Sequence, residues 1–278
     1  MKYIVAVSGG VDSVVLLHKL VMAGEHELIV AHFDHGIRPE SDADARFVEG
    51  LAQSHGLEFQ LRREVLGARA SEALARERRY AFLHELTEQY DAQIVTAHHQ
   101  DDVVETIAIN LIRGTGWRGL AVFGSHNNIV RPLLDMTKQE IYDYALRHTL
   151  EWVEDETNQT DDYLRNRLRK KLTRLPIATR RKLLGLWQRQ LALRSEIEHE
   201  EQIILAKTSG QYSRYFFTHI PDDVAVELLR AVTDCALTRP QAVRALYAVK
   251  TLPAGATHHA GTGVRLQCTR RTFTVQTL

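Results

Sequence analysis

A run of glycines and hydroxyl side chains near the N-terminus has the composition of a phosphate-binding loop. It follows a short apolar stretch, residues 3–7, and precedes a helical pattern at residues 14–23. Glycines let the backbone bring its N–H groups close to an anion, the helix start adds a positive dipole, and serine hydroxyls add donors. We therefore predict a pyrophosphate site in which Asp12 also helps to hold Mg²⁺. The run consists of Ser8, Gly9, Gly10, Val11, Asp12 and Ser13.

The spacing of this loop differs from two better-known nucleotide motifs. It is neither G-x-x-x-x-G-K-S/T nor G-x-G-x-x-G, so a kinase-type phosphate loop and a dinucleotide fingerprint are excluded. A glycine turn with no ligand is the simpler alternative. The hexapeptide resembles the signature of the ATP pyrophosphatase (PP-loop) superfamily, and this resemblance implies that ATP is cleaved between its α and β phosphates to adenylate a substrate oxygen.

Histidines and an aspartate cluster where further strands are expected to end. His32, Asp34 and His35 belong to the second apolar run, and His98 with His99 follows a later one. Such residues can bind a metal, contact phosphate or ribose, or pair with one another inside the fold. We assign His32 to ATP binding and Asp34, His35 and His98 to catalysis or Mg²⁺, and we expect no structural metal site.

Two carboxylates open the helical pattern at residues 101–111. Asp102 and Glu105 are three residues apart, so they share one helix face and could hold a cation. Carboxylates at a helix start also favour its dipole without any ligand, and this alternative stays open. The loop that follows contains Arg113 and Gly114, which we assign to a ribose or phosphate of ATP. The earlier run from Ala75 to Tyr80 reads more simply as a solvated charged face.

The net charge of zero conceals two oppositely charged halves. Residues 1–160 carry 15 Lys and Arg against 25 Asp and Glu, and residues 161–278 carry 20 against 10. The excess is densest between Arg165 and Lys182, which predicts a polyanionic partner and, more specifically, a tRNA-binding segment. The residues assigned to tRNA are Arg165, Arg167, Arg169, Lys170, Lys171 and Arg174.

The elements that must position these residues alternate in type. Such alternation predicts an α/β fold with a doubly wound parallel sheet and ligands at the carboxyl ends of its strands. Thr137, with Glu140 three residues later, predicts the start of another helix. The expected strands are 3–7, 28–33, 58–63 and 93–97, and the expected helices are 14–23, 42–55, 71–89 and 101–111.

The rest of the chain is expected to be a helical basic segment followed by a small α+β domain. Residues 161–208 have a helical pattern, two short helices surround Pro221 and Pro240, and residues 263–277 read as a hairpin. We expect a catalytic domain at 1–175, a helical linker at 176–215 and a small tRNA-binding domain at 216–278. No apolar run approaches a membrane span, so we expect a cytoplasmic protein without membrane contact, and whether two copies associate stays open.

Seven motifs in order resemble the tRNA(Ile)-lysidine synthetase family within the PP-loop superfamily. They are S-G-G-x-D-S, A-H-x-x-H-G-I-R, A-R-x-x-R-Y, H-H-x-x-D-x-x-E-T, R-G-T-G-x-x-G-L, R-P-L-L and D-x-x-N-x-x-x-x-Y-x-R-N-x-x-R. The last comprises Asp155, Asn158, Tyr163, Arg165, Asn166 and Arg169. The family's usual Asp-x-Ser-Asn reads Asp-Glu-Thr-Asn here, which keeps the hydroxyl.

This resemblance implies a two-step reaction on a tRNA. The wobble cytidine of the CAU anticodon of tRNA(Ile) is adenylated by ATP with Mg²⁺, and free lysine then displaces AMP. Asp102 and Glu105 would hold the lysine. A PP-loop tRNA thiolase is an alternative, but it needs a reactive cysteine, and Cys235 and Cys268 both lie far from the motifs. An amidoligase and a non-catalytic RNA-binding module are further alternatives, of which the second leaves the ATP loop unexplained.

Overall fold

The chain forms two compact units. The computed structural model describes residues 1–36, 41–67, 71–124, 129–154, 168, 172, 175–208, 210–261 and 263–277. Unit 1 is Met1–Leu191 and unit 2 is Ala192–Leu278. The division falls inside one helix, α7 (Ile177–Leu205), whereas the sequence placed boundaries after residues 175 and 215.

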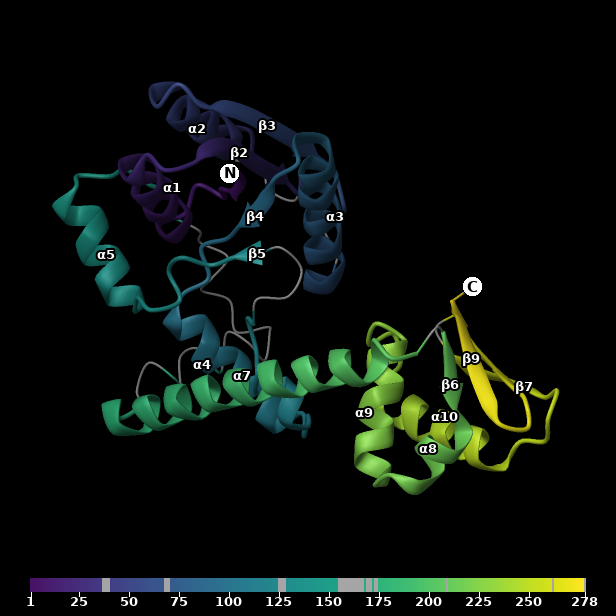
Figure 1. The fold of residues 1–278 in the computed structure, drawn as a ribbon. Helices are drawn as coiled ribbons and strands as arrows, with labels where there is room; N and C mark the ends of the chain where they lie inside the picture. Colours follow the sequence, from purple (N-terminus) through teal and green to yellow (C-terminus); the bar gives the residue numbers. More distant parts are fainter. Residues whose placement is uncertain are drawn as a thin grey trace. The chain divides into compact units, whose positions relative to one another are not determined.

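Unit 1 is built on a five-stranded parallel sheet. Its order is β3-β2-β1-β4-β5, so the chain runs outward in one direction from β1 and then returns to β1 to run outward in the other (Figure 1). This topology confirms the predicted doubly wound sheet and puts its switch point between β1 and β4. The strands are β1 (Lys2–Ala6), β2 (Glu27–Asp34), β3 (Glu58–Arg63), β4 (Gln93–Val95) and β5 (Ile129–Val130).

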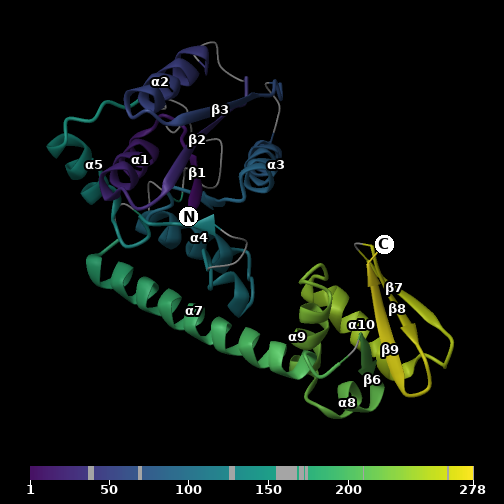
Figure 2. The same cartoon turned by 45° about the horizontal axis from the view of Figure 1, so that its top comes forward.

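Helices cover both faces of this sheet. The α1 helix (Val11–Ala23), α2 (Ser41–Ser54) and α5 (Lys138–Arg147) pack on one face, and α3 (Glu72–Tyr90) packs on the other (Figure 2). The inner strands β1, β2 and β4 are therefore buried on both sides, which explains their nearly continuous apolar runs, whereas the edge strand β3 stays partly exposed. The α4 helix (Gln100–Ile112) and the short 3₁₀ helix η1 (Trp117–Gly119) follow β4.

Local sequence signals explain the helix boundaries. The Thr137 hydroxyl accepts a hydrogen bond from the Glu140 N–H at 3.2 Å, and the Glu140 carboxylate accepts one from the Thr137 N–H at 2.7 Å. This confirms the predicted capping box at the start of α5. The β5 strand has only two residues, too few for a periodic pattern, so the sequence did not reveal it.

Unit 2 contains the end of α7, three short helices and a four-stranded antiparallel sheet of order β6-β9-β8-β7. The predicted hairpin is confirmed as β8 (Val264–Cys268) and β9 (Thr272–Thr277). The sequence did not reveal α8, β6 or β7. The other elements are β6 (Gln211–Ser213), α8 (Arg214–His219), α9 (Asp222–Val232), α10 (Arg239–Thr251) and β7 (Thr257–Gly261).

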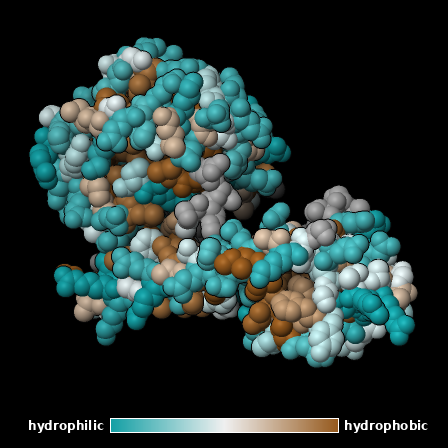
Figure 3. All heavy atoms as spheres, in the orientation of Figure 1, coloured by the Kyte–Doolittle hydropathy of each residue, from teal (hydrophilic) through white to brown (hydrophobic). Residues whose placement is uncertain are grey.

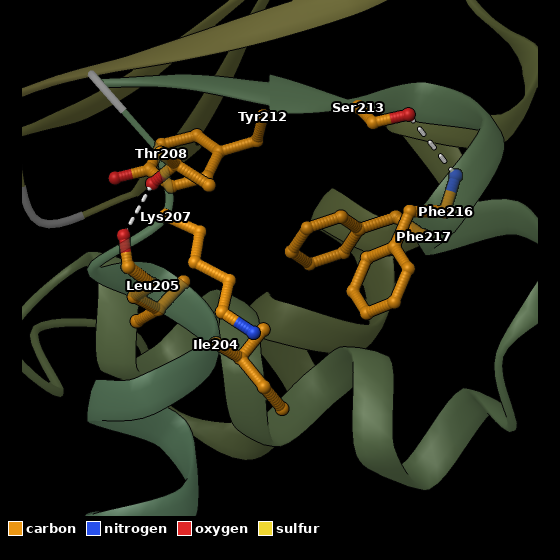
Figure 4. A pocket seen from close by; sticks show the side chains of 8 residues that line it. All are labelled: Ile204, Leu205, Lys207, Thr208, Tyr212, Ser213, Phe216 and Phe217. Carbon is orange, nitrogen blue, oxygen red and sulfur yellow. Dashed lines mark hydrogen bonds between the residues drawn. The ribbon is translucent and has the colours of Figure 1, made fainter.

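Unit 2 holds an apolar pocket of about 350 Å³ between the end of α7, β6 and α8 (Figure 4). Phe216 and Phe217 line it, and Lys207 is its only charged lining residue. Apolar side chains also gather on the visible surface over the end of α7 and over α9 (Figure 3), where Ile203 and Val224 are exposed. Among the described residues, no helix combines the length and apolar character needed to cross a membrane.

Candidate active site

The candidate site lies at the switch point of the parallel sheet. Strands β1 and β4 are direct neighbours, so the loop after β1 and the start of α4 after β4 meet at one edge. Ligands of open α/β sheets bind in this kind of crevice, beyond the carboxyl ends of the strands. The structure therefore brings together the two motifs that the sequence assigned to ATP and to a cationic substrate.

The loop after β1 leads into a helix start that has no side-chain cap, while the Ser8 N–H donates to the Ser13 hydroxyl at 3.2 Å. Gly9 has a φ of +92°, which favours glycine, and its carbonyl accepts a hydrogen bond from the Val153 N–H at 3.0 Å. Gly10 is the N-cap of α1 and supplies no side-chain cap, so the first N–H groups of the helix keep their capacity to bind an anion. The Ser13 hydroxyl donates to the Gly10 carbonyl at 2.8 Å and lies 3.3 Å from the Ser8 hydroxyl.

The Asp12 carboxylate at the start of α1 is surrounded by positive and titratable groups. Its Oδ1 accepts a hydrogen bond from Lys138 Nζ at 2.6 Å and lies 3.7 Å from His99 Nε2. The same His99 nitrogen lies 3.6 Å from Asp102 Oδ2. His99 therefore bridges the phosphate-loop carboxylate and the carboxylate that opens α4.

Asp101 ties three helices together at this edge. Its Oδ2 accepts the backbone N–H of Lys138 at 2.8 Å, and its Oδ1 accepts a hydrogen bond from Arg180 of α7. Burial alone would raise the pKa of Asp101, but these two hydrogen bonds and the positive charge of Arg180 outweigh it and lower the pKa. The sequence assigned Lys138 no role, and it placed Arg180 in the basic segment that is expected to bind tRNA, not beside Asp101. The predicted N-cap at Thr137 placed Lys138 in a first helical turn, but no sequence signal pointed it at Asp12.

Replacing Asp101 with asparagine is expected to lower the free energy of unfolding by about 1–3 kcal/mol at neutral pH, because a charge-assisted bond network is lost. The folded-state pKa of Asp101 is depressed, so its contribution is complete above the ordinary pKa of about 4 and disappears as pH falls through the folded value. Urea unfolding of both chains from pH 7 downward should show the difference shrinking in acid. A difference independent of pH would contradict this role.

Asp102 and Glu105 face the same interior. Asp102 Oδ2 accepts the His99 N–H at 3.0 Å, so this carboxylate also caps its own helix. This contact agrees with the alternative that carboxylates at a helix start stabilise the helix without any ligand. Burial raises the pKa of Asp102, and the negative charges of Glu105 and Asp12 raise it further, against the lowering effect of His99. Glu105 is only 3% exposed. This concentration of buried negative charge suits a cationic ligand, and the assignment to lysine stays a prediction.

Contacts within the fold hold His32, Asp34 and His98, whereas the buried Nδ1 of His35 has no hydrogen-bond partner among the described residues. His32 Nδ1 donates to the Val7 carbonyl at 2.8 Å and so fixes the end of β1 against β2. Asp34 accepts the Gly36 N–H at 2.7 Å and lies 3.3 Å from Arg63 Nε, so both of its oxygens are engaged. Burial lowers the pKa of His35. His98 Nδ1 lies 2.8 Å from the Thr96 hydroxyl.

Other assigned residues are not brought to this edge. Arg113 and Gly114 follow the last residue of α4, about 20 Å of helix away from the His99 end.

No group of three His, Cys, Asp or Glu side chains forms a metal site in the part of the chain that the structure describes. The tRNA-binding candidates Arg165, Arg167, Arg169, Lys170, Lys171 and Arg174 lie outside the described residues, as does the motif that begins at Asp155.

Comparisons with known proteins agree with this geometry. The PP-loop domain family matches residues 1–175. The chain is 44% identical over 174 residues to a tRNA(Ile)-lysidine synthase of Exiguobacterium sibiricum, which covers 61% of this chain and 42% of that protein. It is 37% identical over 246 residues to a protein of the same name from Solibacter usitatus, covering 87% and 52% respectively. The chain thus spans about half the length of these curated relatives.

A solved structure shares the fold. The U34-tRNA thiolase NcsA of Methanococcus maripaludis superposes with a TM-score of 0.58 at 18% identity, covering 69% of this chain and 73% of that one. At this identity the likeness concerns the fold alone. The family match extends over more than half of the chain and includes every residue of the switch-point site except Arg180. The chain therefore belongs to the PP-loop domain family.

Proposed function

We propose that this chain catalyses the ATP-dependent joining of lysine to the wobble cytidine of the CAU anticodon of tRNA(Ile). The observation that carries the proposal is the similarity to relatives named tRNA(Ile)-lysidine synthase through the PP-loop domain. The switch-point site supports it, because a helix start without a side-chain cap and a group of buried carboxylates adjoin there. The reaction needs both, one for the pyrophosphate of ATP and one for the ammonium groups of lysine.

The first step adenylates the RNA. The 2-oxo oxygen of the cytidine attacks the α-phosphorus of ATP, and the bond to the oxygen bridging the α and β phosphorus atoms breaks to release pyrophosphate. The uncapped N–H groups of α1 and the hydroxyl of Ser8 fit the leaving pyrophosphate, and the Ser13 hydroxyl, which donates to the Gly10 carbonyl, holds the loop in shape. Lys138 offsets charge beside Asp12. Mg²⁺ is commonly held by one or two carboxylates plus phosphate oxygens, so Asp12 is a fitting protein ligand for it, and the ion would neutralise phosphate charge.

The second step transfers lysine. The ε-amine attacks C2 of the adenylated cytidine, AMP leaves with the C2 oxygen, and the amine loses a proton. Asp102 and Glu105 would bind ammonium groups of the incoming lysine, since a partly desolvated ammonium needs a carboxylate to offset its lost hydration. Asp102, whose pKa is raised by burial, and the adjoining His99 would be the candidates to accept this proton.

The basic segment is proposed to supply much of the tRNA affinity. Replacing Lys170, Lys171 and Arg174 together with alanine is expected to weaken tRNA binding. The steepness of log affinity against log salt should fall by about 2 to 3, because each phosphate that is no longer neutralised keeps its counterions on binding. Filter binding over a salt series measures this slope. An unchanged slope would mean that the segment is merely a solvated surface.

The proposed function has a direct test in product release. AMP and pyrophosphate should form in equal amounts only when ATP, lysine and tRNA(Ile) with a CAU anticodon are all present. A tRNA with the same anticodon but a different body serves as the control substrate. AMP formation that needs the tRNA but ignores lysine would favour another RNA-modifying PP-loop enzyme, and formation without any tRNA would favour an amidoligase.

A further inference from the structure

A group of cationic and aromatic side chains lies at the same sheet edge but on the other face. Helix α3 joins the parallel strands β3 and β4, so it runs against them and begins at their carboxyl ends. Its first turns contain Arg76, Arg79 and Tyr80. Arg76 Nη2 donates to the Tyr80 hydroxyl at 3.3 Å, and the Arg76 and Arg79 guanidinium carbons lie 4.8 and 5.5 Å from the Tyr80 ring centroid.

A second part of the group comes from the segments around β5. Arg131 follows β5 directly, and its guanidinium lies 5.3 Å from the centroid of the Phe123 ring. The Phe123 ring in turn lies 4.8 Å from that of His98, which follows β4. Strands β4 and β5 are parallel neighbours, so Arg131 after β5 and the first turns of α3 lie at the same carboxyl edge of the sheet. Burial lowers the pKa of Arg131, the charge of Tyr80 raises it, and the charge of Arg76 lowers it again. We call Arg76, Arg79, Tyr80, Phe123 and Arg131 the arginine–aromatic cluster.

The cluster differs from neighbouring arginines in its partners. Arg62 Nη2 lies 2.6 Å from Glu85 Oε2, and Arg78 Nε lies 3.5 Å from Glu64 Oε1. Within the described parts of the chain, no carboxylate lies at ion-pair distance from Arg76 or Arg131. Arg131 instead donates to the carbonyls of Ile129 and Gly124, at 3.2 and 3.4 Å. Arg76 and Arg131 therefore bring positive charge that no carboxylate of the described residues pairs, as in a site for an external anion.

Aromatic rings among guanidinium groups fit a nucleotide of an RNA loop. Unpaired loop bases stack on aromatic rings and guanidinium planes, while the phosphates beside them pair with arginine. The pyrophosphate loop opens α1, which packs on the opposite face of the sheet, so ATP phosphates have a separate binding place. We propose that the arginine–aromatic cluster binds an anticodon-loop nucleotide next to the one that is modified, by stacking its base and pairing its phosphate. This proposal rests on the function proposed above.

The test measures RNA and ATP affinities separately for the full chain. The RNA probe is the anticodon stem–loop of tRNA(Ile) with a CAU anticodon. Arg76→Gln is expected to weaken RNA binding about fivefold and to reduce the salt slope by about 1, and Tyr80→Leu to weaken it about tenfold, with Tyr80→Phe close to wild type. The dissociation constant for ATP should be unchanged in all three. Arg78→Gln is the matched control, because Arg78 is exposed on the same helix but paired with Glu64.

Each outcome decides the proposal. RNA affinity lost in Arg76→Gln and Tyr80→Leu but kept in Tyr80→Phe and Arg78→Gln supports it, provided that the thermal unfolding midpoints match. Unchanged RNA affinity in Arg76→Gln and Tyr80→Leu overturns it while leaving the proposed function standing. Loss of ATP affinity instead of RNA affinity assigns the cluster to ATP and also overturns it. A wild-type chain that binds no stem–loop and transfers no lysine overturns the proposed function and this inference together.

Discussion

Replacing Asp12 with alanine is expected to reduce the rate of AMP formation at least about a hundredfold, the usual cost of losing one preorganised electrostatic group at a reacting centre. The substitution removes the carboxylate that Lys138 contacts at 2.6 Å and that His99 approaches at 3.7 Å. Lys138 and His99 would then lose this partner, and the proposed Mg²⁺ ligand would be missing. Single-turnover AMP formation with saturating ATP, lysine and tRNA measures the effect.

The control for Asp12 is Asp143→Ala. Asp143 is an exposed carboxylate on α5 that accepts a hydrogen bond from Gln139 at 2.9 Å, so its loss also removes one negative charge from unit 1. This control should turn over at the wild-type rate. Near-wild-type turnover in a folded Asp12→Ala chain would remove Asp12 from the site, whatever the control does.

Glu105→Gln is expected to separate the two steps of the proposed reaction. The glutamine keeps the shape of a side chain that is 3% exposed but removes its charge. Losing a charge-assisted hydrogen bond worth about 1.5–3 kcal/mol should raise the lysine concentration needed for half-maximal transfer by about ten- to a hundredfold. Adenylated tRNA formed without lysine should accumulate as in the wild type.

Two measurements on Glu105→Gln check this expectation: the adenylated intermediate without lysine, and lysine transfer over a concentration series. The thermal unfolding midpoint serves as the control for packing, because the side chain is buried. Asp102→Asn is less discriminating, since Asp102 also caps α4 through the His99 N–H. An unaltered lysine requirement together with failed adenylation would assign Glu105 to the first step instead.

The parallel sheet could be predicted because its information is local. Strands and helices alternate along residues 1–111. Short apolar runs that are separated by segments with helical periodicity are compatible with few other folds. Most of the elements that escaped prediction are short, although β7, with five residues, is as long as β1. The two-residue β5, the three-residue β6 and the six-residue α8 carry too few positions to show a period, and their partners alone stabilise them.

The site was predictable only as separate motifs. The sequence showed the loop around Asp12 and the carboxylates of α4, and the parallel topology then placed both at one edge. The ion pairs that organise the site join residues far apart in sequence: Lys138 and Asp12 are separated by 126 positions, and Arg180 and Asp101 by 79. Arg76 is exposed, as the predicted solvated helix face requires, but nothing local in the sequence revealed that its charge would act on Arg131.

The identity of the modified nucleoside tests the central claim most directly. The chain is incubated with ATP, isotopically labelled lysine and tRNA(Ile) bearing a CAU anticodon, and the tRNA is digested to nucleosides for mass spectrometry. The proposed function predicts that the wobble cytidine is replaced by a nucleoside heavier by one lysine less water, with the label in it and the 2-oxo oxygen lost to AMP. An unmodified wobble cytidine in the presence of a folded, ATP-binding chain would contradict it.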